Sequence, residues 1–589
     1  MVEPIETTRY TIPMNTFSDQ FDFIPFPKDI AQDVQSVQFS KTAGATIVPE
    51  SALEKIAHDS FARLSFTFPR SHLEHLISAA LSPDASENDR YVCACMLKNA
   101  LVASKGAFPL CQDTGIANIF GWKKGAFIPV SAGGANNADS NGSGANEGAT
   151  SSAYRALSEG ARKLYDERRL RFSTSCPSSF YEEYDPKNNM PAQVALFDED
   201  SCLAPPPGFL AESPTNSLSL IFCAKGGGSS NKTSFVQGTK ASLNPAAFEK
   251  FVAEQLRKFG TSACPPYTIA VVAGGLSPEQ NLLTLKLATC GAYDGMTYEP
   301  NPYGFRDKEL EDKVREIAAR TGYGAQFGGT KFAVDAIVIR LSRHGASCPL
   351  SAGVSCSAHR NLKAVVTKDG FYIEKTCANP AELDGFEKAA RLADDEGTTA
   401  RVISTDGGIQ KVLNSLKGAQ PGDRIVLNGD ILVARDAAHA RWQKLLDAGK
   451  PLPDYCMRYP ICYAGPARTP DGAVIGSFGP TTAGRMDVYA DALMSRGAAL
   501  VTLAKGNRSK QWTDACAKYG SFYLGTPGGV AALIASEYIT AQKIVDYEDL
   551  GMEAVRLVTV KNLPAFVITT DRGEDFYERL AESAVPQLK

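Results

Sequence analysis

The sequence predicts an α/β protein with a mixed α+β N-terminal domain and an α/β C-terminal domain. Apolar residues three or four apart in residues 51–105 predict helices there. Beyond residue 397, strand-like runs alternate with helical segments, which is typical of α/β folds. The chain has 589 residues, 44% of them hydrophobic and 21% charged, as in a soluble globular protein. Such a length suggests roughly two to four domains.

Charge and hydropathy exclude some classes of partner. The net charge is −4 with acidic and basic residues nearly balanced, so the basic surface that nucleic acids require is not expected. No apolar run reaches the roughly 18 residues of a membrane span. The first residues include Glu3 and Glu6, unlike a signal or transit peptide. We therefore expect a cytoplasmic protein without a nucleic-acid or membrane partner.

The N-terminal elements follow in order. Residues 1–40 are interrupted by prolines and predict an extended arm. Within the helical region, the segment 90–105 ends at Gly106, as helices commonly do. Residues 131–149 are of low complexity and predict a mobile loop, and residues 202–216 predict a surface insertion.

Strands dominate the next part of the chain. The apolar run 218–224 predicts a buried strand, and the runs 267–273 and 334–341 predict two more. A charged helix is expected at residues 307–321. A charged, Ala-rich segment then predicts a linker. The expected division is an arm at 1–40, a domain at 41–376, a linker at 377–396 and a second domain at 397–589.

The C-terminal domain shows the alternation most clearly. Two strands are expected on either side of a turn at Asn428–Gly429, followed by a helix from about Asp436. Residues 479–484 open another helix, and the apolar run 498–504 predicts a strand that ends at Lys505.

The stretch Lys225–Thr233, K-G-G-G-S-S-N-K-T, resembles a phosphate-binding loop after a strand. A Walker A loop needs a second glycine where this chain has Asn231, and a β-carbon there hinders wrapping around a phosphate. A nucleotide site is therefore disfavoured. An anion-binding turn and a plain glycine turn both remain open.

The chain has fourteen cysteines and no C-x-x-C pair, so zinc-ribbon and thioredoxin spacings are absent. Cys223 and Cys290 lie in apolar surroundings that predict core positions. Three others lie in turns of small residues: Cys111, Cys264 and Cys356. From spacing alone, these three are either ordinary loop cysteines or a ligand set.

Eight motifs together resemble the class I fumarases, the iron–sulfur fumarate hydratase family. They are Phe108–Gly115, Lys225–Thr233, Gly260–Tyr267, Gly324–Gly329, Arg343–Pro349, Gly353–Ser357, Gly479–Asp487 and Leu503–Arg508. The resemblance runs in order from about residue 40 to the C-terminus.

This resemblance implies a [4Fe–4S] cluster held by Cys111, Cys264 and Cys356, buried at the junction of the two domains, with one iron free of protein ligands. Cys348, eight residues before Cys356, is not expected to be a ligand. An iron with an open position acts as a Lewis acid in hydration without redox change. The resemblance also implies a homodimer, and an exposed iron predicts loss of activity in air, recoverable with iron and thiol.

The resemblance further assigns substrate and catalytic residues. The substrate-binding residues that it implies are Gln112, Arg171, Gly228, His344, Arg435, Arg485 and Lys505. Thr481 is implied as the catalytic base and Asp113 as the acid that assists loss of the hydroxyl. By itself, each of these cations is more usual as a surface charge, and Thr481 and Thr482 as helix caps.

The expected reaction is therefore the reversible hydration of fumarate to (S)-malate. Related enzymes of the family act on tartrate or mesaconate, and these substrates remain alternatives. Two readings from other classes are a P-loop kinase, against which Asn231 argues, and a non-catalytic redox or iron sensor. A sensor would keep the three cysteines without needing the Arg, Lys and Thr set.

Overall fold

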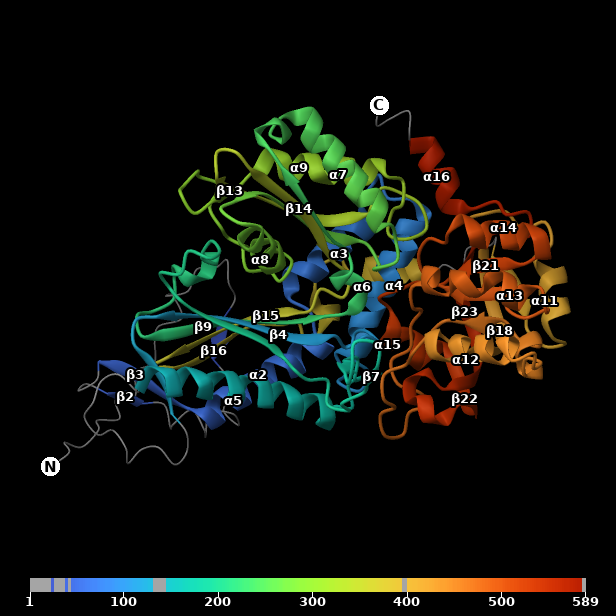
Figure 1. Cartoon of the computed structure of the whole chain (residues 1–589), viewed down its shortest axis with the longest axis horizontal. Helices are drawn as coiled ribbons and strands as arrows, with labels where there is room; N and C mark the ends of the chain where they lie inside the picture. The colour runs from blue at the N-terminus through green and yellow to red at the C-terminus, as the bar shows by residue number, and fades with distance from the viewer. Residues whose placement is uncertain (1–22, 26–37, 41–43, 131–144, 395–399, 585–589) are drawn as a thin grey trace.

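The computed structural model describes residues 23–25, 38–40, 44–130, 145–394 and 400–584. Figure 1 shows two halves side by side, a blue-to-yellow N-terminal half and an orange-to-red C-terminal half. Helices and strands are mixed in the first half and alternate in the second, which confirms the predicted α/β class. None of the described helices is long and apolar enough to span a membrane.

Three helices occupy the predicted helical region: α2 (Glu50–Phe66), α3 (Arg70–Leu81) and α4 (Glu87–Ala103). Helix α4 begins with a reciprocal cap. The Ser86 hydroxyl accepts a hydrogen bond from the Asp89 N–H, and the Asp89 carboxylate accepts one from the Ser86 N–H.

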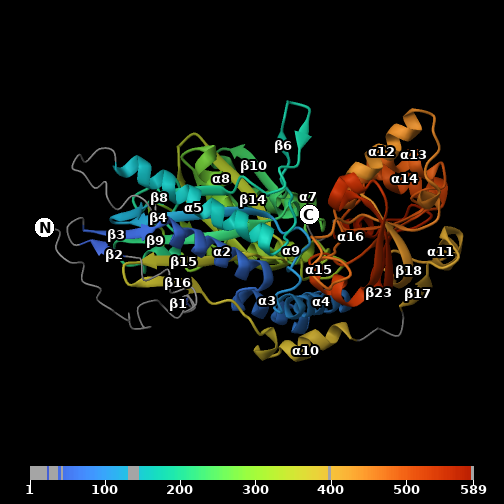
Figure 2. The same ribbon diagram turned by 90° about the horizontal axis from the view of Figure 1, so that it is seen from below.

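A six-stranded sheet forms the centre of the N-terminal half. In spatial order its strands are β1 (Phe23–Pro25), β16 (Gly370–Glu374), β15 (Asn361–Thr367), β9 (Ser217–Lys225), β4 (Ile116–Lys124) and β8 (Gln193–Asp198). Strand β9 is buried along its whole length, which confirms the strand predicted at 218–224. Helices α2 and α5 (Ala145–Glu167) lie side by side along one face in Figures 1 and 2, packed against apolar side chains of β4, β9 and β15.

A five-stranded sheet packs against the other face of the first sheet. Its strands, in spatial order, are β10 (Thr233–Gly238), β14 (Cys348–Ser355), β11 (Tyr267–Gly275), β13 (Ala333–Arg343) and β12 (Phe305–Arg306). The helices of this layer are α7 (Pro245–Phe259), α8 (Pro278–Ala288) and α9 (Lys308–Arg320). The strands predicted at 267–273 and 334–341 and the helix predicted at 307–321 are therefore confirmed.

The C-terminal half is built on a seven-stranded sheet. In spatial order its strands are β17 (Arg401–Ser404), β18 (Arg424–Val433), β19 (Ile461–Cys462), β20 (Val501–Ala504), β21 (Phe522–Gly525), β23 (Val555–Thr569) and β22 (Ile539–Asp546). Strand β23 pairs with both β18 and β21, which closes part of the sheet into a barrel. The helices are α11 (Ile409–Leu416), α12 (Asp436–Asp447), α13 (Ala490–Met494), α14 (Lys510–Tyr519), α15 (Ala531–Leu533) and α16 (Phe576–Ala584).

Smaller elements complete the described chain. Strands β2 (Gln38–Ser40), β3 (Ala45–Pro49) and β5 (Phe127–Val130) form a small sheet, and a single turn of helix, α6 (Gly227–Ser230), follows β9. The hairpin of β6 (Cys176–Pro177) and β7 (Glu183–Tyr184) projects from the body in Figure 2. The 3₁₀ helix η7 (Ala483–Tyr489) follows the segment predicted to open a helix.

The prediction of a turn at Asn428–Gly429 is wrong. Strand β18 continues through both residues, with a register shift against β23 between Leu427 and Gly429 and a left-handed φ of 105° at Gly429. The Asn-Gly pair, typical of hairpins, lies within β18 and faces a β-bulge of β23, where Lys561 and Asn562 together lie opposite Asn428.

Three predicted connecting segments contain more structure than expected. Residues 131–144 of the predicted loop lie outside the described residues, but α5 already begins at Ala145. The insertion at 202–216 buries Phe209 and Leu210 in the core between the two sheets. The predicted linker contains α10 (Phe386–Ala390), and Phe386 is buried. The predicted arm and the domain boundaries remain predictions.

The crossing of α2 and α5 predicts a stability effect. A methyl group at Gly160 would lie 2.0 Å from the Glu54 carbonyl oxygen, so the helices must move apart. We expect Gly160→Ala to lower the free energy of unfolding by about 1–3 kcal/mol, seen as a lower melting temperature. Gly345→Ala is the control, because its methyl group meets no atom within 4 Å. Equal melting temperatures for the two variants would contradict this packing.

Candidate active site

Two of the three turn cysteines lie at the same end of the five-stranded sheet. Cys264 precedes β11 and Cys356 follows β14, and the antiparallel pairing of Thr268 with Ser355 places both at one end. The Ser357 N–H donates a hydrogen bond to the Cys264 carbonyl at 3.0 Å. Cys264 has a left-handed φ of 62°, a conformation that a non-glycine residue adopts at some energetic cost.

Cys111 reaches the same place from the segment between α4 and β4. Its thiol donates to the Gln112 side-chain oxygen at 3.4 Å. The pKa of Cys264 is raised to about 11, mainly by burial and to a smaller extent by the nearby Cys356 and Cys111, while Lys505 opposes this rise. The structure therefore brings the three predicted cysteines together.

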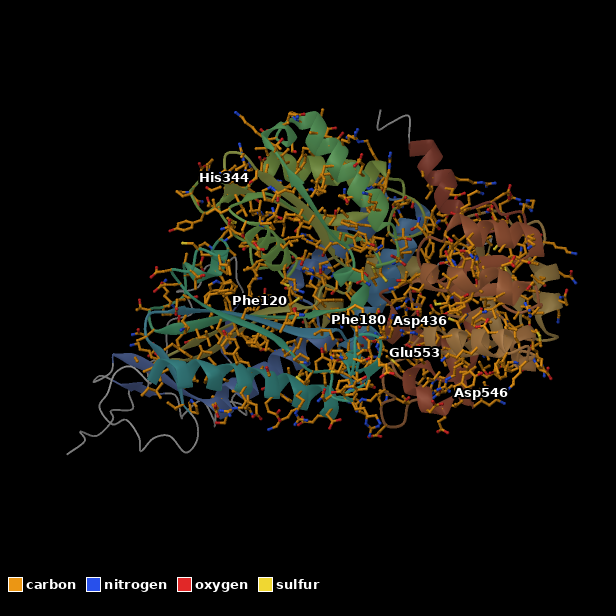
Figure 3. All side chains as sticks on the ribbon, viewed as in Figure 1. Phe120, Phe180, His344, Asp436, Asp546 and Glu553 are labelled. Carbon is orange, nitrogen blue, oxygen red and sulfur yellow. The ribbon has the colours of Figure 1, made fainter. Side chains whose placement is uncertain are left out.

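Cys348 and His344 do not join this group. Cys348 begins β14 and Cys356 follows its last residue, so a strand of roughly 25 Å separates them. His344 is exposed in the turn before β14, and Figure 3 shows it well away from Asp436 and Glu553. Within one chain, His344 is thus distant from the other predicted substrate residues.

Lys505 joins the C-terminal half to the cysteines. Its ammonium donates to the Cys264 sulfur at 2.8 Å. Its backbone N–H donates to the Thr481 carbonyl at 3.1 Å, and its own carbonyl accepts from the Ala483 N–H at 2.9 Å. This backbone pairing places Thr481 beside the lysine.

Thr481 does not cap a helix. Thr482 occupies the N-cap position of η7, and it makes no side-chain cap hydrogen bond. The Thr481 hydroxyl instead accepts a hydrogen bond from Arg485 Nη2 at 2.6 Å. Burial lowers the pKa of Arg485, with Asp436 opposing that effect.

Two acidic residues hold the neighbouring arginines. Asp436 Oδ2 lies 3.2 Å from both Arg435 Nε and Arg485 Nη2. Glu553 contacts Arg435 Nη2 at 3.1 Å and accepts a hydrogen bond from the Ala437 N–H at 2.8 Å. Figure 3 shows Asp436 and Glu553 close together on the side that faces the N-terminal half.

Asp113 forms the N-terminal side of the site. Its carboxylate lies 2.9 Å from Arg171 Nη2 and accepts from the Gly227 N–H at 2.9 Å. Burial raises the pKa of Asp113, but Arg171, Arg360 and the Gly227 N–H together outweigh it and hold this pKa below its ordinary value. Asp113 is therefore a carboxylate at neutral pH.

The glycine-rich loop serves this aspartate. A β-carbon on Gly226 would lie 2.9 Å from Asp113 Oδ2, whereas one on Gly228 would make only ordinary contacts. The loop therefore needs glycine most strictly at Gly226. Since the first amide of α6 already binds Asp113, this loop does not present a free cradle to a nucleotide phosphate.

A cavity of about 380 Å³ opens between the two halves. Its lining includes five cationic side chains and one carboxylate. The cations are Arg171, Lys225, Lys286, Arg435 and Arg485, and the carboxylate is Asp113. Such an excess of positive charge suits a small anion with more than one carboxylate.

Several residues of the site carry no role in the sequence analysis. Arg360 is buried, and Cys111, Cys356 and Asp113 raise its pKa against the effect of burial. The Gln326 side-chain amide donates hydrogen bonds to the Pro265 and Gly528 carbonyls, each at 2.9 Å. It belongs to the motif Gly324–Gly329, for which the sequence analysis gives no role. Neither Glu553 nor Gly465 belongs to a recognised motif, so no local pattern could have found them.

No group of three or more His, Cys, Asp or Glu side chains in the described part of the chain is arranged to hold a single metal ion. A polynuclear cluster makes a different demand, because its thiolates bind separate irons and need not converge on one point.

The chain matches two family models. Residues 54–365 match the model described as fumarate hydratase, and residues 372–580 match the one described as fumarase C-terminus. Fumarate hydratase 1, mitochondrial, of Leishmania major is 42% identical over 90% of this chain and 91% of its own length. The anaerobic class I fumarate hydratase of Escherichia coli is 43% identical over 91% of this chain and 92% of its own length.

Gly465 provides a test of the cationic cavity. Its carbonyl accepts from Arg171 Nη1 at 3.1 Å, and a β-carbon there would lie 2.6 Å from Arg435 Nη1. We expect Gly465→Ala to displace the Arg435 guanidinium. The dissociation constant for the dicarboxylate succinate, measured by calorimetry, should then rise about tenfold or more. Gly160→Ala, which lies away from the cavity, is expected to keep the wild-type affinity. Unchanged succinate binding by Gly465→Ala would contradict this arrangement.

Proposed function

Because the chain belongs to the class I fumarate hydratase family and is a hydro-lyase, we propose that it interconverts fumarate and (S)-malate with a [4Fe–4S] cluster on Cys111, Cys264 and Cys356. The observation that carries the proposal is the gathering of these three thiols beside a cavity lined by cations from both halves.

The residues present fit such a cluster. Thiolates are the usual ligands of iron–sulfur clusters, and three rather than four leave one iron open. Lys505 and Arg360 lie close enough to the thiols to oppose the rise in pKa that burial causes at Cys111 and Cys264. Gly528 leaves room beside Cys264, because a β-carbon there would lie 2.3 Å from the cysteine sulfur.

When bound, the cluster would supply a Lewis acid that polarises oxygen atoms of the substrate. The side chains of the cavity would hold the two carboxylates. Arg171 enters from the N-terminal half, and Arg435 and Arg485 from the C-terminal half. Lys505, Gln112 and the Gly228 backbone would also contact the substrate, as the family resemblance implies. Donors fixed around developing negative charge stabilise the carbanion-like transition state of dehydration.

Two protein groups would move protons. In dehydration, Thr481 would take the proton from the carbon next to a carboxylate. Asp113 would give a proton to the departing hydroxide, and for this it must first take up a proton, because its resting form is the carboxylate. In hydration the roles reverse, so Asp113 accepts a proton from water, which is what its ionised state allows. The hydrogen bond from Arg485 favours an ionised Thr481 oxygen and thereby supports the role of base.

A homodimer in the cytoplasm is proposed, as the family resemblance and the sequence suggest. His344 lies away from the other site residues of its own chain, so it would contact substrate only in the site of a second copy.

The function is tested by malate formation from fumarate, under nitrogen, with the full chain reconstituted with iron and sulfide. We expect activity in the wild type and none in Cys264→Ala, because that variant loses a cluster ligand. Cys348→Ala is the matched control and is expected to keep activity, since this cysteine lies at the far end of β14.

Tartrate and mesaconate are assayed in parallel. A wild type with a normal cluster spectrum that converts one of these and not fumarate would contradict the proposed substrate. A wild type that carries the cluster and converts none of the three substrates would favour the hypothesis of a non-catalytic redox or iron sensor.

Filling the space beside Cys264 is expected to reduce the amount of iron that the protein binds. We expect Gly528→Ala to retain less than about half of the wild-type iron and acid-labile sulfide, since its methyl group displaces the Cys264 sulfur and Lys505. Chemical analysis of both elements after reconstitution measures this, with Gly345→Ala as control. Full loading of Gly528→Ala would show that Cys264 is not held where a cluster requires it.

A further inference from the structure

A buried ion pair joins two of the recognised motifs behind the active site. Asp487 Oδ1 lies 2.6 Å from Arg508 Nε, and Asp487 Oδ2 accepts from the Ser509 N–H at 2.6 Å. The Arg508 side chain has no exposed surface and that of Asp487 is 6% exposed. Neither residue has a role in the proposed reaction.

Aromatic rings enclose the charged group. The Arg508 guanidinium carbon lies 3.2 Å from the centre of the Trp512 ring, 4.9 Å from that of Tyr523 and 5.5 Å from that of Tyr463. A planar guanidinium can stack on a ring and donate in its own plane at the same time. The site therefore fixes the position of Arg508 by two kinds of contact.

The arginine ends a loop, residues 505–508, whose first three residues contact the segment that carries Cys264. Lys505 donates to the Cys264 sulfur, and Asn507 Oδ1 accepts from the Thr261 N–H at 3.2 Å. Gly506 approaches Ser262 so closely that a β-carbon would lie 2.5 Å from the serine Cβ. The loop 505–508 thus holds the segment that carries Cys264.

The aspartate belongs to the helix that carries the substrate arginine. Asp487 lies on η7, two residues after Arg485. The start of η7 is bonded to Lys505 through the Ala483 N–H. At its other side, Asp487 holds the loop again through Arg508 and Ser509. The helix is therefore clamped to the loop at two points, with Arg485 between them.

We propose that Asp487 and Arg508 are positioning residues that fix Arg485 and Lys505 relative to each other across the substrate. This proposal rests on the proposed function for the identity of the substrate. The charged ends of Arg485 and Lys505 each have other partners, but the clamp sets the distance between the backbones of these two residues. Without the pair, η7 is held to the loop by the backbone bonds at Thr481 and Ala483.

Two substitutions test the clamp in different ways. Asp487→Asn keeps the shape, but an amide has one acceptor oxygen where the carboxylate serves two N–H donors, so its NH₂ group faces a donor. Arg508→Lys keeps the charge and the stem but loses the planar donor that meets Asp487. Arg508→Lys is the milder change, and it tests the proposal by itself if Asp487→Asn does not fold.

The matched control is Glu311→Gln, which breaks another buried ion pair. Glu311 pairs with Arg306 at 2.7 Å, in the N-terminal half on α9. All variants are reconstituted under nitrogen, and their melting temperature, cluster absorption, succinate dissociation constant, KM and kcat are measured.

We expect Asp487→Asn to raise the succinate dissociation constant and KM together at least tenfold, and Arg508→Lys to raise them by a smaller factor. Cluster absorption should stay normal in Arg508→Lys. Glu311→Gln should lose stability and keep the wild-type succinate affinity. Wild-type succinate affinity and KM in both clamp variants would overturn the proposal, and so would an equal loss of affinity in Glu311→Gln.

The two proposals fail in different ways. Hydration of fumarate by the wild type tests the function, whereas the ratio of succinate affinities tests the clamp. A wild type that binds succinate without hydrating fumarate, together with weak binding in the clamp variants, would keep the clamp and refute the substrate.

Discussion

The contact between Lys505 and Cys264 is the point on which the rest of the site depends. It joins a loop of the C-terminal barrel to the turn that precedes strand β11 in the N-terminal half. The backbone of the same lysine pairs with Thr481, so one loop residue places an ammonium beside a thiol and a hydroxyl beside an arginine. A site divided between two halves of a chain needs such a cross-link, because neither half contains both the thiols and all the cations.

Charge balance is the second constraint. The cavity gathers cations that would repel one another in a site closed to water, and acidic side chains hold several of them in place. Asp113 pairs with Arg171, while Asp436 and Glu553 pair with Arg435. These pairs orient the guanidinium groups and leave an excess of positive charge for a dicarboxylate. Preorganised charge of this kind acts on the transition state without rearrangement during the reaction.

Much of the fold could be predicted from local pattern. The apolar run 218–224 and the charged helix at 307–321 were found because burial and amphipathic spacing are written in adjacent residues. The Asn428–Gly429 turn was wrong because pairing with a distant strand decided the outcome. For the site, motifs named Cys111 and Arg485, but no spacing rule connects Glu553 to Arg435. Contacts of that kind depend on tertiary register, which a single sequence does not display.

The measurement that tests the account most directly is a crystal structure of the anaerobically reconstituted protein with succinate, with data collected at the iron absorption edge. The account predicts anomalous iron density bounded by the sulfur atoms of Cys111, Cys264 and Cys356. It also predicts succinate between that density and the guanidinium groups of Arg171, Arg435 and Arg485. Iron bound elsewhere, or succinate outside the cavity between the two halves, would contradict it.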